Sequence, residues 1–279
     1  MSLDFLDLQA LLKKYQIRPK KSLGQNFLAD PNGLLKVIDA AEISAEDSVL
    51  EIGAGLGSLT ILLAQKAKIV TAVELDNSLI APLKEGLEGF DNVKLVEGDV
   101  LKLSPETLMD QPGYLVVANI PYYITSAIIR HLLSATSKPT RMIMTIQKEV
   151  AERILARDGK HSLLSLSVHV FGKPELVSII PSGCFYPSPD VDSAVIRIRL
   201  YAEPLIRLDA MEDFFKLAHA GFSQKRKTLR NSLSAGLQIS TQSGEALLEN
   251  AGISPQRRAE TLTIEEWRRL TEEFEHSRY

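Results

Sequence analysis

The stretch Val49-Leu50-Glu51-Ile52-Gly53-Ala54-Gly55-Leu56-Gly57-Ser58 decides the fold that we expect for this chain. Its first half predicts a short buried strand over residues 48–52, and its end opens a predicted helix over residues 58–67. Glycines between a strand and a helix let the backbone turn tightly and approach a ligand at the carboxyl end of a sheet. Their spacing is G-x-G-x-G, because Ser58 stands where a dinucleotide fingerprint would require glycine. The motif therefore favours a ligand without a pyrophosphate, and a glycine turn that binds nothing is the alternative.

The strand and helix around this turn belong to a longer alternating pattern. Short β-branched runs predict further strands at residues 69–74, 93–96, 114–118 and 141–146. Helical patterns are predicted between them at residues 77–87 and 126–133. Such alternation is typical of an α/β fold with a parallel sheet covered by helices on both faces.

Elements outside this alternation suggest two domains. Asp30-Pro31 is typical of a helix start, and the helix is expected to end near Ala41. Residues 175–180 and 194–200 predict an antiparallel pair at the sheet edge, and residues 209–277 predict four or five short helices. We therefore expect a Rossmann-like domain over residues 1–204, with an N-terminal helical extension, and a small helical domain over residues 205–279.

Composition narrows the class of protein. Cys184 is the only cysteine among the 279 residues, so no internal disulfide is possible and a reducing cytoplasm is expected. The five histidines lack metal-ligand spacing, and we expect no metal site. No apolar run approaches the roughly 18 residues of a membrane span, and the N-terminus lacks a signal-peptide core. An organellar protein that has lost a transit peptide is also compatible with this sequence.

The basic residues form two clusters although the formal net charge is −3. Residues 13–21 contain five basic groups and no acidic one, and residues 214–244 again contain five and none. Two such clusters in an acidic chain suggest a nucleic-acid interface, although solvated faces are the simpler interpretation of each alone. The candidate RNA-binding residues are Lys20, Lys21, Lys225, Arg226, Lys227 and Arg230.

Two carboxylates follow the next predicted strands after the glycine turn. Glu74 ends one strand, where a carboxylate can accept hydrogen bonds from both ribose hydroxyls. Asp99 follows the third strand, where a carboxylate can accept from an adenine amino group. Together with Gly53 and Gly55 they predict a pocket for an adenosine without phosphates, and S-adenosylmethionine fits that description best. Each carboxylate alone is equally compatible with an ordinary exposed side chain.

The sequence Asn119-Ile120-Pro121-Tyr122 ends the fourth predicted strand, beside this pocket. The oxygen of the Asn119 side chain and a backbone carbonyl beside Pro121 can accept hydrogen bonds from an exocyclic amine and direct its lone pair at a methyl donor. Tyr122 can stack on an extruded base, and Phe185 is a candidate for the opposite wall of the base pocket. The alternatives are a plain turn with two buried tyrosines and, around Phe185, a proline-rich connector.

These segments resemble the bacterial small-subunit ribosomal RNA adenine N6,N6-dimethyltransferases, and the resemblance spans nearly the whole chain. The matching segments are residues 21–28 (KSLGQNFL), 51–57 (EIGAGLG), 74–76 (ELD), 98–99 (GD), 119–122 (NIPY), 185–193 (FYPSPDVDS), 225–229 (KRKTL) and 257–262 (RRAETL).

The resemblance implies a class I S-adenosylmethionine-dependent methyltransferase fold, with a seven-stranded, mostly parallel sheet and a small all-α C-terminal domain. It implies transfer of four methyl groups to N6 of two adjacent adenosines in the 3′-terminal hairpin loop of 16S rRNA in the small (30S) ribosomal subunit. A role in subunit biogenesis and a monomeric state are also implied. The implied cofactor contacts are Gln25, Asn26, Leu28, Gly53, Glu74, Asp99 and Asn119.

Three other functions remain open from the residues. Macrolide-resistance methyltransferases modify one adenosine of 23S rRNA and share the Gln25-Asn26-Phe27 and Asn-Ile-Pro-Tyr features. The acidic net charge and the residues 192–195 and 257–262 argue against that group. A DNA adenine methyltransferase is disfavoured because D-P-P-Y is absent. A non-catalytic assembly or transcription factor on the same scaffold is disfavoured by the intact candidate site.

Overall fold

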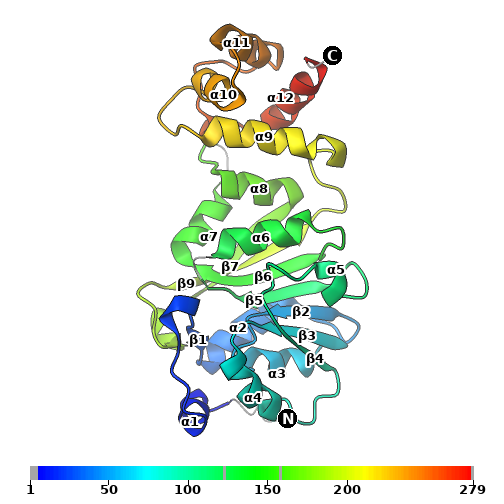
Figure 1. Ribbon diagram of the computed structural model, residues 1–279, viewed down its shortest axis with the longest axis vertical. Coiled ribbons are helices and arrows are strands. Elements are labelled where there is room, and N and C mark those ends of the chain that lie inside the picture. The colour runs from blue at the N-terminus through cyan, green and yellow to red at the C-terminus, as the bar shows by residue number, and fades with distance from the viewer. Residues whose placement is uncertain (1–5, 122–123, 157–158, 278–279) are drawn as a thin grey trace. The chain divides into compact units, whose positions relative to one another are not determined.

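A computed structural model describes residues 6–121, 124–156 and 159–277 of the chain. The chain divides into two compact units (Figure 1). The sheet unit consists of Met1–Ala151 and Glu175–Leu200, and the helical unit consists of Glu152–Pro174 and Tyr201–Tyr279. The predicted boundary between residues 204 and 205 lies near the third passage of the chain between the two units, which follows Leu200. The sequence did not predict that residues 152–174 belong with the C-terminal helices.

The sheet unit is built on a seven-stranded sheet in the order β4-β3-β2-β5-β6-β9-β7 (Figure 1). Its strands are β2 (Ser48–Ile52), β3 (Ile69–Glu74), β4 (Val93–Glu97), β5 (Leu115–Asn119), β6 (Arg141–Gln147), β7 (Gly172–Ile180) and β9 (Ser193–Leu200). Strands β4 to β6 pair in parallel, and β9 runs antiparallel to β6. The mostly parallel α/β sheet predicted from the sequence is therefore confirmed.

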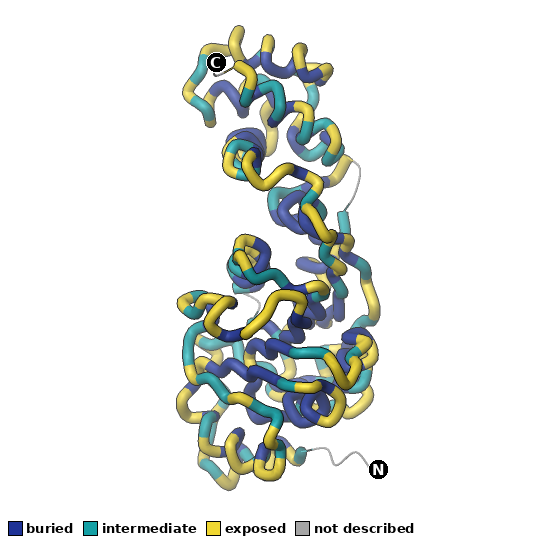
Figure 2. The backbone as a smooth tube through the Cα atoms, turned by 90° about the vertical axis from the view of Figure 1, so that its right-hand side faces the viewer, coloured by how far each residue is buried: buried dark blue, intermediate teal, exposed yellow. Residues whose placement is uncertain are grey.

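Both faces of this sheet are buried. On one face Val49, Val70 and Val117 pack in a core cluster with residues of α2 (Pro31–Ala41) and α3 (Ser58–Ala64). Leu50 and Val116 lie on the same strands but face the other side of the sheet, and they are also fully buried. Continuous apolar strands of this kind are expected for a sheet covered on both sides. In Figure 2 the central strands are accordingly dark blue, while exposed positions concentrate in the connections.

The helices that the sequence predicted in the sheet unit are present, whereas its short helical and strand segments were not predicted. The helix that starts at Asp30-Pro31 is α2, because the Asp30 carboxylate accepts the Gly33 N–H at 2.7 Å and Pro31 fits the first helical turn. The other elements are α1 (Leu8–Lys14), η1 (Lys21–Leu23), β1 (Phe27–Leu28), α4 (Asn77–Gly86), α5 (Pro105–Leu108), α6 (Thr125–Ser134), α7 (Lys148–Leu155), η3 (Ser182–Cys184) and β8 (Phe185–Tyr186). The sequence pattern did not predict α7, which follows β6 without an intervening turn.

The helical unit packs around one aromatic cluster. Its elements are α8 (Leu163–Phe171), η4 (Leu208–Ala210), α9 (Met211–Phe222), α10 (Leu229–Leu237), α11 (Thr241–Asn250), η5 (Ala259–Thr261) and α12 (Ile264–His276). Trp267 on α12 is fully buried between Phe214 and Phe222 of α9, with ring centroids 6.5 and 5.9 Å away. No helix in the described part of the chain is long and apolar enough to cross a membrane.

Close packing of α9 against α10 gives the first prediction. A Cβ added at Gly236 would lie 2.6 Å from the backbone of Ala220, so Gly236→Ala forces the two helices apart. We expect a loss of about 1–3 kcal/mol in unfolding free energy, typical of overpacking. Fluorescence of Trp267, the single tryptophan, reports the midpoint. Gly183→Ala meets open space and serves as the matched control. Equal midpoints for both variants would contradict the tight contact.

Candidate cofactor and substrate site

A cavity of about 100 Å³ opens at the carboxyl ends of the parallel strands. The ends of β2, β3 and β5, the turn after β4, and residues 23–27 of the N-terminal region line it. Eight of the predicted site residues come together in this lining: Gln25, Asn26, Gly53, Gly55, Glu74, Asp99, Asn119 and Pro121. The tertiary structure therefore gathers residues that are spread over about a third of the chain.

The glycine turn between β2 and α3 requires glycine for two different reasons. Gly53 and Gly55 have φ of +79° and +62°, which side chains with a Cβ rarely adopt. A Cβ at Gly53 would also lie 3.2 Å from the backbone oxygen of Asn119, so β2 and β5 approach closely at this point. A Cβ at Gly55 would lie 3.1 Å from the Phe27 ring, which packs directly on the turn.

Glu74 holds this turn from the end of β3. Its Oε2 accepts the Gly55 N–H at 2.7 Å, and its Oε1 accepts the Asp76 N–H at 2.8 Å. Burial raises the pKa of Glu74, since its side chain is almost inaccessible to water, although both backbone hydrogen bonds favour the charged form. A carboxylate offers about four lone-pair sites, so two acceptor positions remain for a pair of ligand hydroxyls.

The other acidic residues near the turn, Asp99 and Glu51, differ in burial. Asp99 accepts the Leu101 N–H at 3.1 Å and remains partly exposed at the cavity, where its second oxygen is 3.7 Å from Lys102. Glu51, in contrast, is buried within the sheet unit, and burial raises its pKa to about 8. Glu51 is therefore protonated at neutral pH, and it adds no second negative charge beside Glu74.

Asn119 is the last residue of β5 and lines the cavity. Its Nδ2 donates to the backbone oxygen of Asn26 at 3.1 Å, which orients the amide and leaves Oδ1 as the acceptor. Pro121 lines the same cavity. Tyr122, the predicted stacking residue, lies outside the described residues, so its role stays a prediction.

Two predicted site residues lie away from the main cavity. Leu28 lines a neighbouring cavity of about 30 Å³, which it shares with Gly53, Gly55 and Asn119. Phe185 pairs with Leu28 between β8 and β1 and is buried in the core cluster. It does not belong to the described lining of the main cavity, and its role as a wall of the base pocket stays a prediction.

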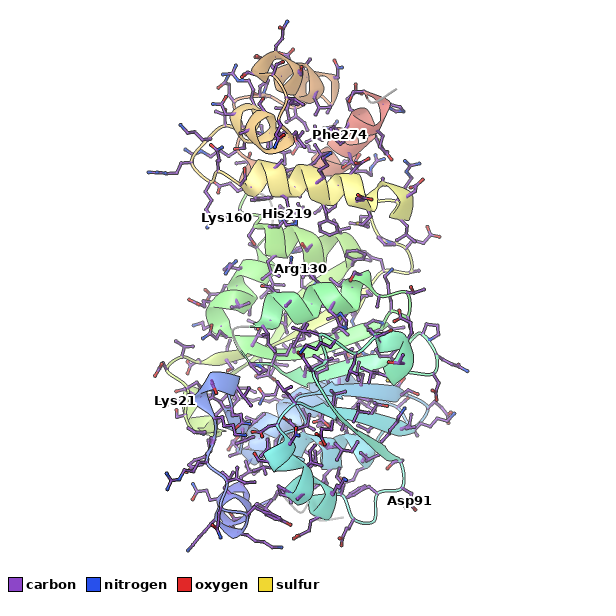
Figure 3. All side chains as sticks on the ribbon, in the orientation of Figure 1. Lys21, Asp91, Arg130, Lys160, His219 and Phe274 are labelled. Atoms are coloured by element: carbon purple, nitrogen blue, oxygen red, sulfur yellow. The ribbon has the colours of Figure 1, made fainter. Side chains whose placement is uncertain are left out.

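The predicted RNA-binding residues fall into two groups. Lys20 and Arg230 have carboxylate partners, because Lys20 lies 2.6 Å from Asp76 and Arg230 lies 3.2 Å from Glu245. Lys21 is exposed on η1, at the periphery of the sheet unit (Figure 3). Lys225, Arg226 and Lys227 are exposed in the connection from α9 to α10. The side chains of the four exposed residues are accessible to solvent. RNA contact by all six residues stays a prediction.

The structure adds two residues that the sequence analysis did not assign. Thr145 lies beside Asn119 in the parallel register of β6 and β5 and lines the smaller cavity. Asp76, two residues after Glu74, binds Lys20 and Gln25. The sequence did contain a signal for each residue. Thr145 lies near the end of a predicted strand, and Asp76 lies two residues after Glu74. Among the residues that the structure describes, no group of three or more His, Cys, Asp or Glu side chains is arranged to hold a metal ion.

The fold and the cavity together define a class of protein. A mostly parallel seven-stranded sheet with a glycine turn and carboxylates at successive strand ends is the arrangement of class I methyltransferases. Two solved structures share this fold over most of the chain. A 23S rRNA methyltransferase, ErmE, is 32% identical with a TM-score of 0.71 over 90% of this chain and 100% of that chain. A dimethyladenosine transferase from Plasmodium falciparum is 28% identical with a TM-score of 0.75 over 90% and 98%.

Sequence comparison identifies the family within this class. The family described as ribosomal RNA adenine dimethylase matches residues 17–276. Proteins named ribosomal RNA small subunit methyltransferase A are 47% identical in Dehalococcoides mccartyi, over 95% of this chain and 91% of the relative, and 40% identical in Moorella thermoacetica, over 96% of both. The chain belongs to the ribosomal RNA adenine dimethylase family and is an rRNA adenine dimethyltransferase. Membership of this methyltransferase family implies dependence on S-adenosylmethionine.

The raised pKa of Glu74 predicts a pH-dependent affinity for the product S-adenosylhomocysteine. The charged carboxylate accepts hydrogen bonds and the protonated form accepts them poorly, so affinity should be full above the raised pKa and fall as the pH drops through it. Below that pKa we expect the dissociation constant to rise by about tenfold per pH unit. Calorimetry between pH 8 and 5 measures it. Glu74→Gln is the control, with weaker binding and a flat profile; a wild-type profile in that variant would contradict the ribose-binding role.

Proposed function

We propose that this enzyme transfers four methyl groups from S-adenosylmethionine to N6 of two adjacent adenosines in the 3′-terminal hairpin loop of 16S rRNA. The observation that carries the proposal is the Asn119 carboxamide, oriented at the cavity by its bond to Asn26 with its oxygen left as an acceptor. We extend the proposal to a monomeric, metal-independent enzyme that acts in the cytoplasm during assembly of the small ribosomal subunit.

The residues of the main cavity fit S-adenosylmethionine. The two acceptor positions left on Glu74 suit the ribose hydroxyls, and Asp99 suits the adenine amino group. Gln25, Asn26, Leu28, Gly53 and Gly55 would complete the cofactor site, since each lines one of the two adjoining cavities. When bound, S-adenosylmethionine supplies an electrophilic methyl group on a positively charged sulfur.

In the proposed reaction, the residues of the chain contribute to methyl transfer by positioning the adenine amine relative to the methyl donor. An exocyclic adenine amine is a weak nucleophile because its lone pair is delocalised into the ring. Hydrogen bonds from the amine to Asn119 Oδ1 and to the backbone carbonyl beside Pro121 favour a tetrahedral nitrogen whose lone pair can attack. The methylated nitrogen then releases a proton to water, so no side-chain base is needed. Tyr122 and Phe185 complete the proposal as surfaces that hold the extruded base.

The small subunit is favoured as the substrate by the names of the relatives. Proteins 40–47% identical over nearly the full length are named small subunit methyltransferases, while the matched 23S rRNA methyltransferase is 32% identical. The cluster Lys225, Arg226 and Lys227 supports contact with RNA phosphates. Methyl incorporation from labelled cofactor discriminates the candidates. Labelling of small-subunit particles supports the proposal, labelling of 23S rRNA alone overturns it, and no labelling of either favours a non-catalytic assembly factor.

Replacement of Asn119 should affect turnover much more than cofactor binding. We expect Asn119→Ala to lower methyl transfer to small-subunit particles by roughly 10²–10³-fold, the usual loss when a positioned hydrogen-bonding group is removed. The dissociation constant of S-adenosylhomocysteine should change only a few-fold, because Glu74 and Asp99 remain. Single-turnover transfer and calorimetry measure the two quantities. Unchanged turnover would exclude amine positioning by Asn119.

The exposed cluster in the helical unit should determine the salt dependence of particle binding. Replacing Lys225, Arg226 and Lys227 by alanine removes three charges, and we expect the slope of log affinity against log salt to decrease by about 2–3. The matched control is the triple alanine variant of Lys66, Lys68 and Lys84, which are exposed in the sheet unit. Equal slopes for both variants would mean that the cluster faces solvent in the complex.

A further inference from the structure

Asp76 links the N-terminal region to the cofactor cavity although it does not contact the cavity itself. The Asp76 residue is only 4% exposed. Lys20 Nζ lies 2.6 Å from Oδ1, and Gln25 Nε2 donates to Oδ2 at 2.7 Å. The Gln25 side-chain oxygen in turn accepts the Lys20 backbone N–H at 2.7 Å. We call this closed ring of contacts between Lys20, Gln25 and Asp76 the N-terminal latch.

The latch continues through the backbone to the residues of the cavity. The Asp76 N–H donates to Glu74 Oε1, and Glu74 Oε2 accepts from Gly55. Three consecutive hydrogen-bonded steps therefore connect Lys20 to the glycine turn. Asp76 is not among the described residues that line the cavity, so any effect on a bound cofactor must act through its neighbours.

The segment that the latch fastens forms one wall of the cavity. Residues 23–27 belong to the lining, and the Phe27 ring rests on Gly55. Phe27 also packs with Leu12 of α1, Leu56 of the glycine turn and Leu79 of α4 in a small separate core. If this segment moved outwards, the cavity would lose Gln25 and Asn26 together with the contact that orients Asn119.

The charge on the buried Asp76 carboxylate is stabilised by its partners in and beside the latch. Burial raises the pKa of Asp76, but hydrogen bonds from Lys20, Ser78 and Gln25 outweigh it and hold the pKa at about 2. A buried charge whose partner is removed is strongly destabilising, because neither water nor a counter-ion compensates it. The Lys20 side chain is about half exposed, so water can reach it and replace the contact when the segment opens.

We propose that Asp76 is a positioning residue, whose N-terminal latch keeps residues 20–28 closed over the cavity and thereby sets the affinity for S-adenosylmethionine. The inference rests on the proposed function for the identity of the ligand. It assigns Lys20 and Gln25 to closure of the cavity wall. In this arrangement the segment is the movable part of the site, while the strand ends are fixed by the sheet.

Binding of S-adenosylhomocysteine to the full chain tests the latch through a double-mutant cycle. Asp76→Asn removes the charge and keeps a good helix cap for Ser78 N, and Lys20→Met removes the partner. We expect each single variant to weaken binding by roughly 10–100-fold, the range of a charge-assisted hydrogen bond. The double variant should bind no more weakly than either single one. Additive losses would overturn the latch.

Two further measurements separate positioning from a general loss of stability. Hydrogen exchange of residues 20–28 should accelerate in both single variants, while the amides of β2 and β3 keep their protection. Lys20→Arg should restore wild-type affinity. Lys14→Met, which removes an exposed ion pair with Glu85 on α4, is the matched control and should change affinity less than about twofold. Uniformly faster exchange with unchanged affinity would assign Asp76 a structural role alone.

The kinetic consequence distinguishes this inference from the proposed function. At saturating S-adenosylmethionine, Asp76→Asn should retain kcat on small-subunit particles and raise KM for the cofactor, because the closed state is still reached. A fall in kcat without a change in KM would overturn the latch. Binding and exchange need no RNA, so they test the latch even if small-subunit particles are not methylated, and that result would overturn only the proposed substrate.

Discussion

The buried carboxylate of Glu74 is the constraint on which the site depends. It accepts one backbone N–H from the glycine turn and one from the start of α4, and so joins the ends of β2 and β3 into one rigid surface. Burial raises the pKa of Glu74, and the two backbone hydrogen bonds oppose that rise, so both turns favour the charged form of the buried carboxylate. Glycines are required in the same turn, since Gly53 and Gly55 have positive φ and the Gly55 N–H is a donor to this carboxylate.

The charges around the cavity suit recognition of a ligand better than acid–base chemistry. Glu74 and Asp76 are committed to hydrogen bonds, and Glu51 is protonated at neutral pH because it is buried. The group that we propose to hold the amine is the neutral carboxamide of Asn119. An enzyme of this family therefore has to work mainly by placing two reactants and stabilising a developing charge. A wall that closes over the ligand serves such a mechanism, because small displacements of the reacting atoms are costly.

The basic residues are divided between the fold and the surface. Arg141, Arg197 and Arg199 surround Glu42 at the end of α2, and Lys20 and Arg230 are paired with carboxylates. Lys21 and Lys225 to Lys227 remain exposed. Pairing of this kind explains how a chain with a net charge of −3 can still have exposed basic clusters, since many of its charges cancel within the protein.

The sequence by itself determined the elements and the chemistry of the strand ends. Strand patterns, the Asp30-Pro31 cap and the glycine turn depend on interactions within a few residues, so β2 to β6 and eight of the site residues could be predicted. Helix α8 was missed because its apolar residues alternate with Ser165, Ser167 and His169, a period that is typical of a strand rather than of an amphipathic helix. Only the tertiary structure decided that Lys20 and Gln25 meet Asp76 rather than solvent or ligand, and that residues 152–174 join the helical unit. The contacts of Asp76 join residues 51 and 56 positions apart, and those of residues 152–174 also lie outside their own segment, so no local pattern encodes either outcome.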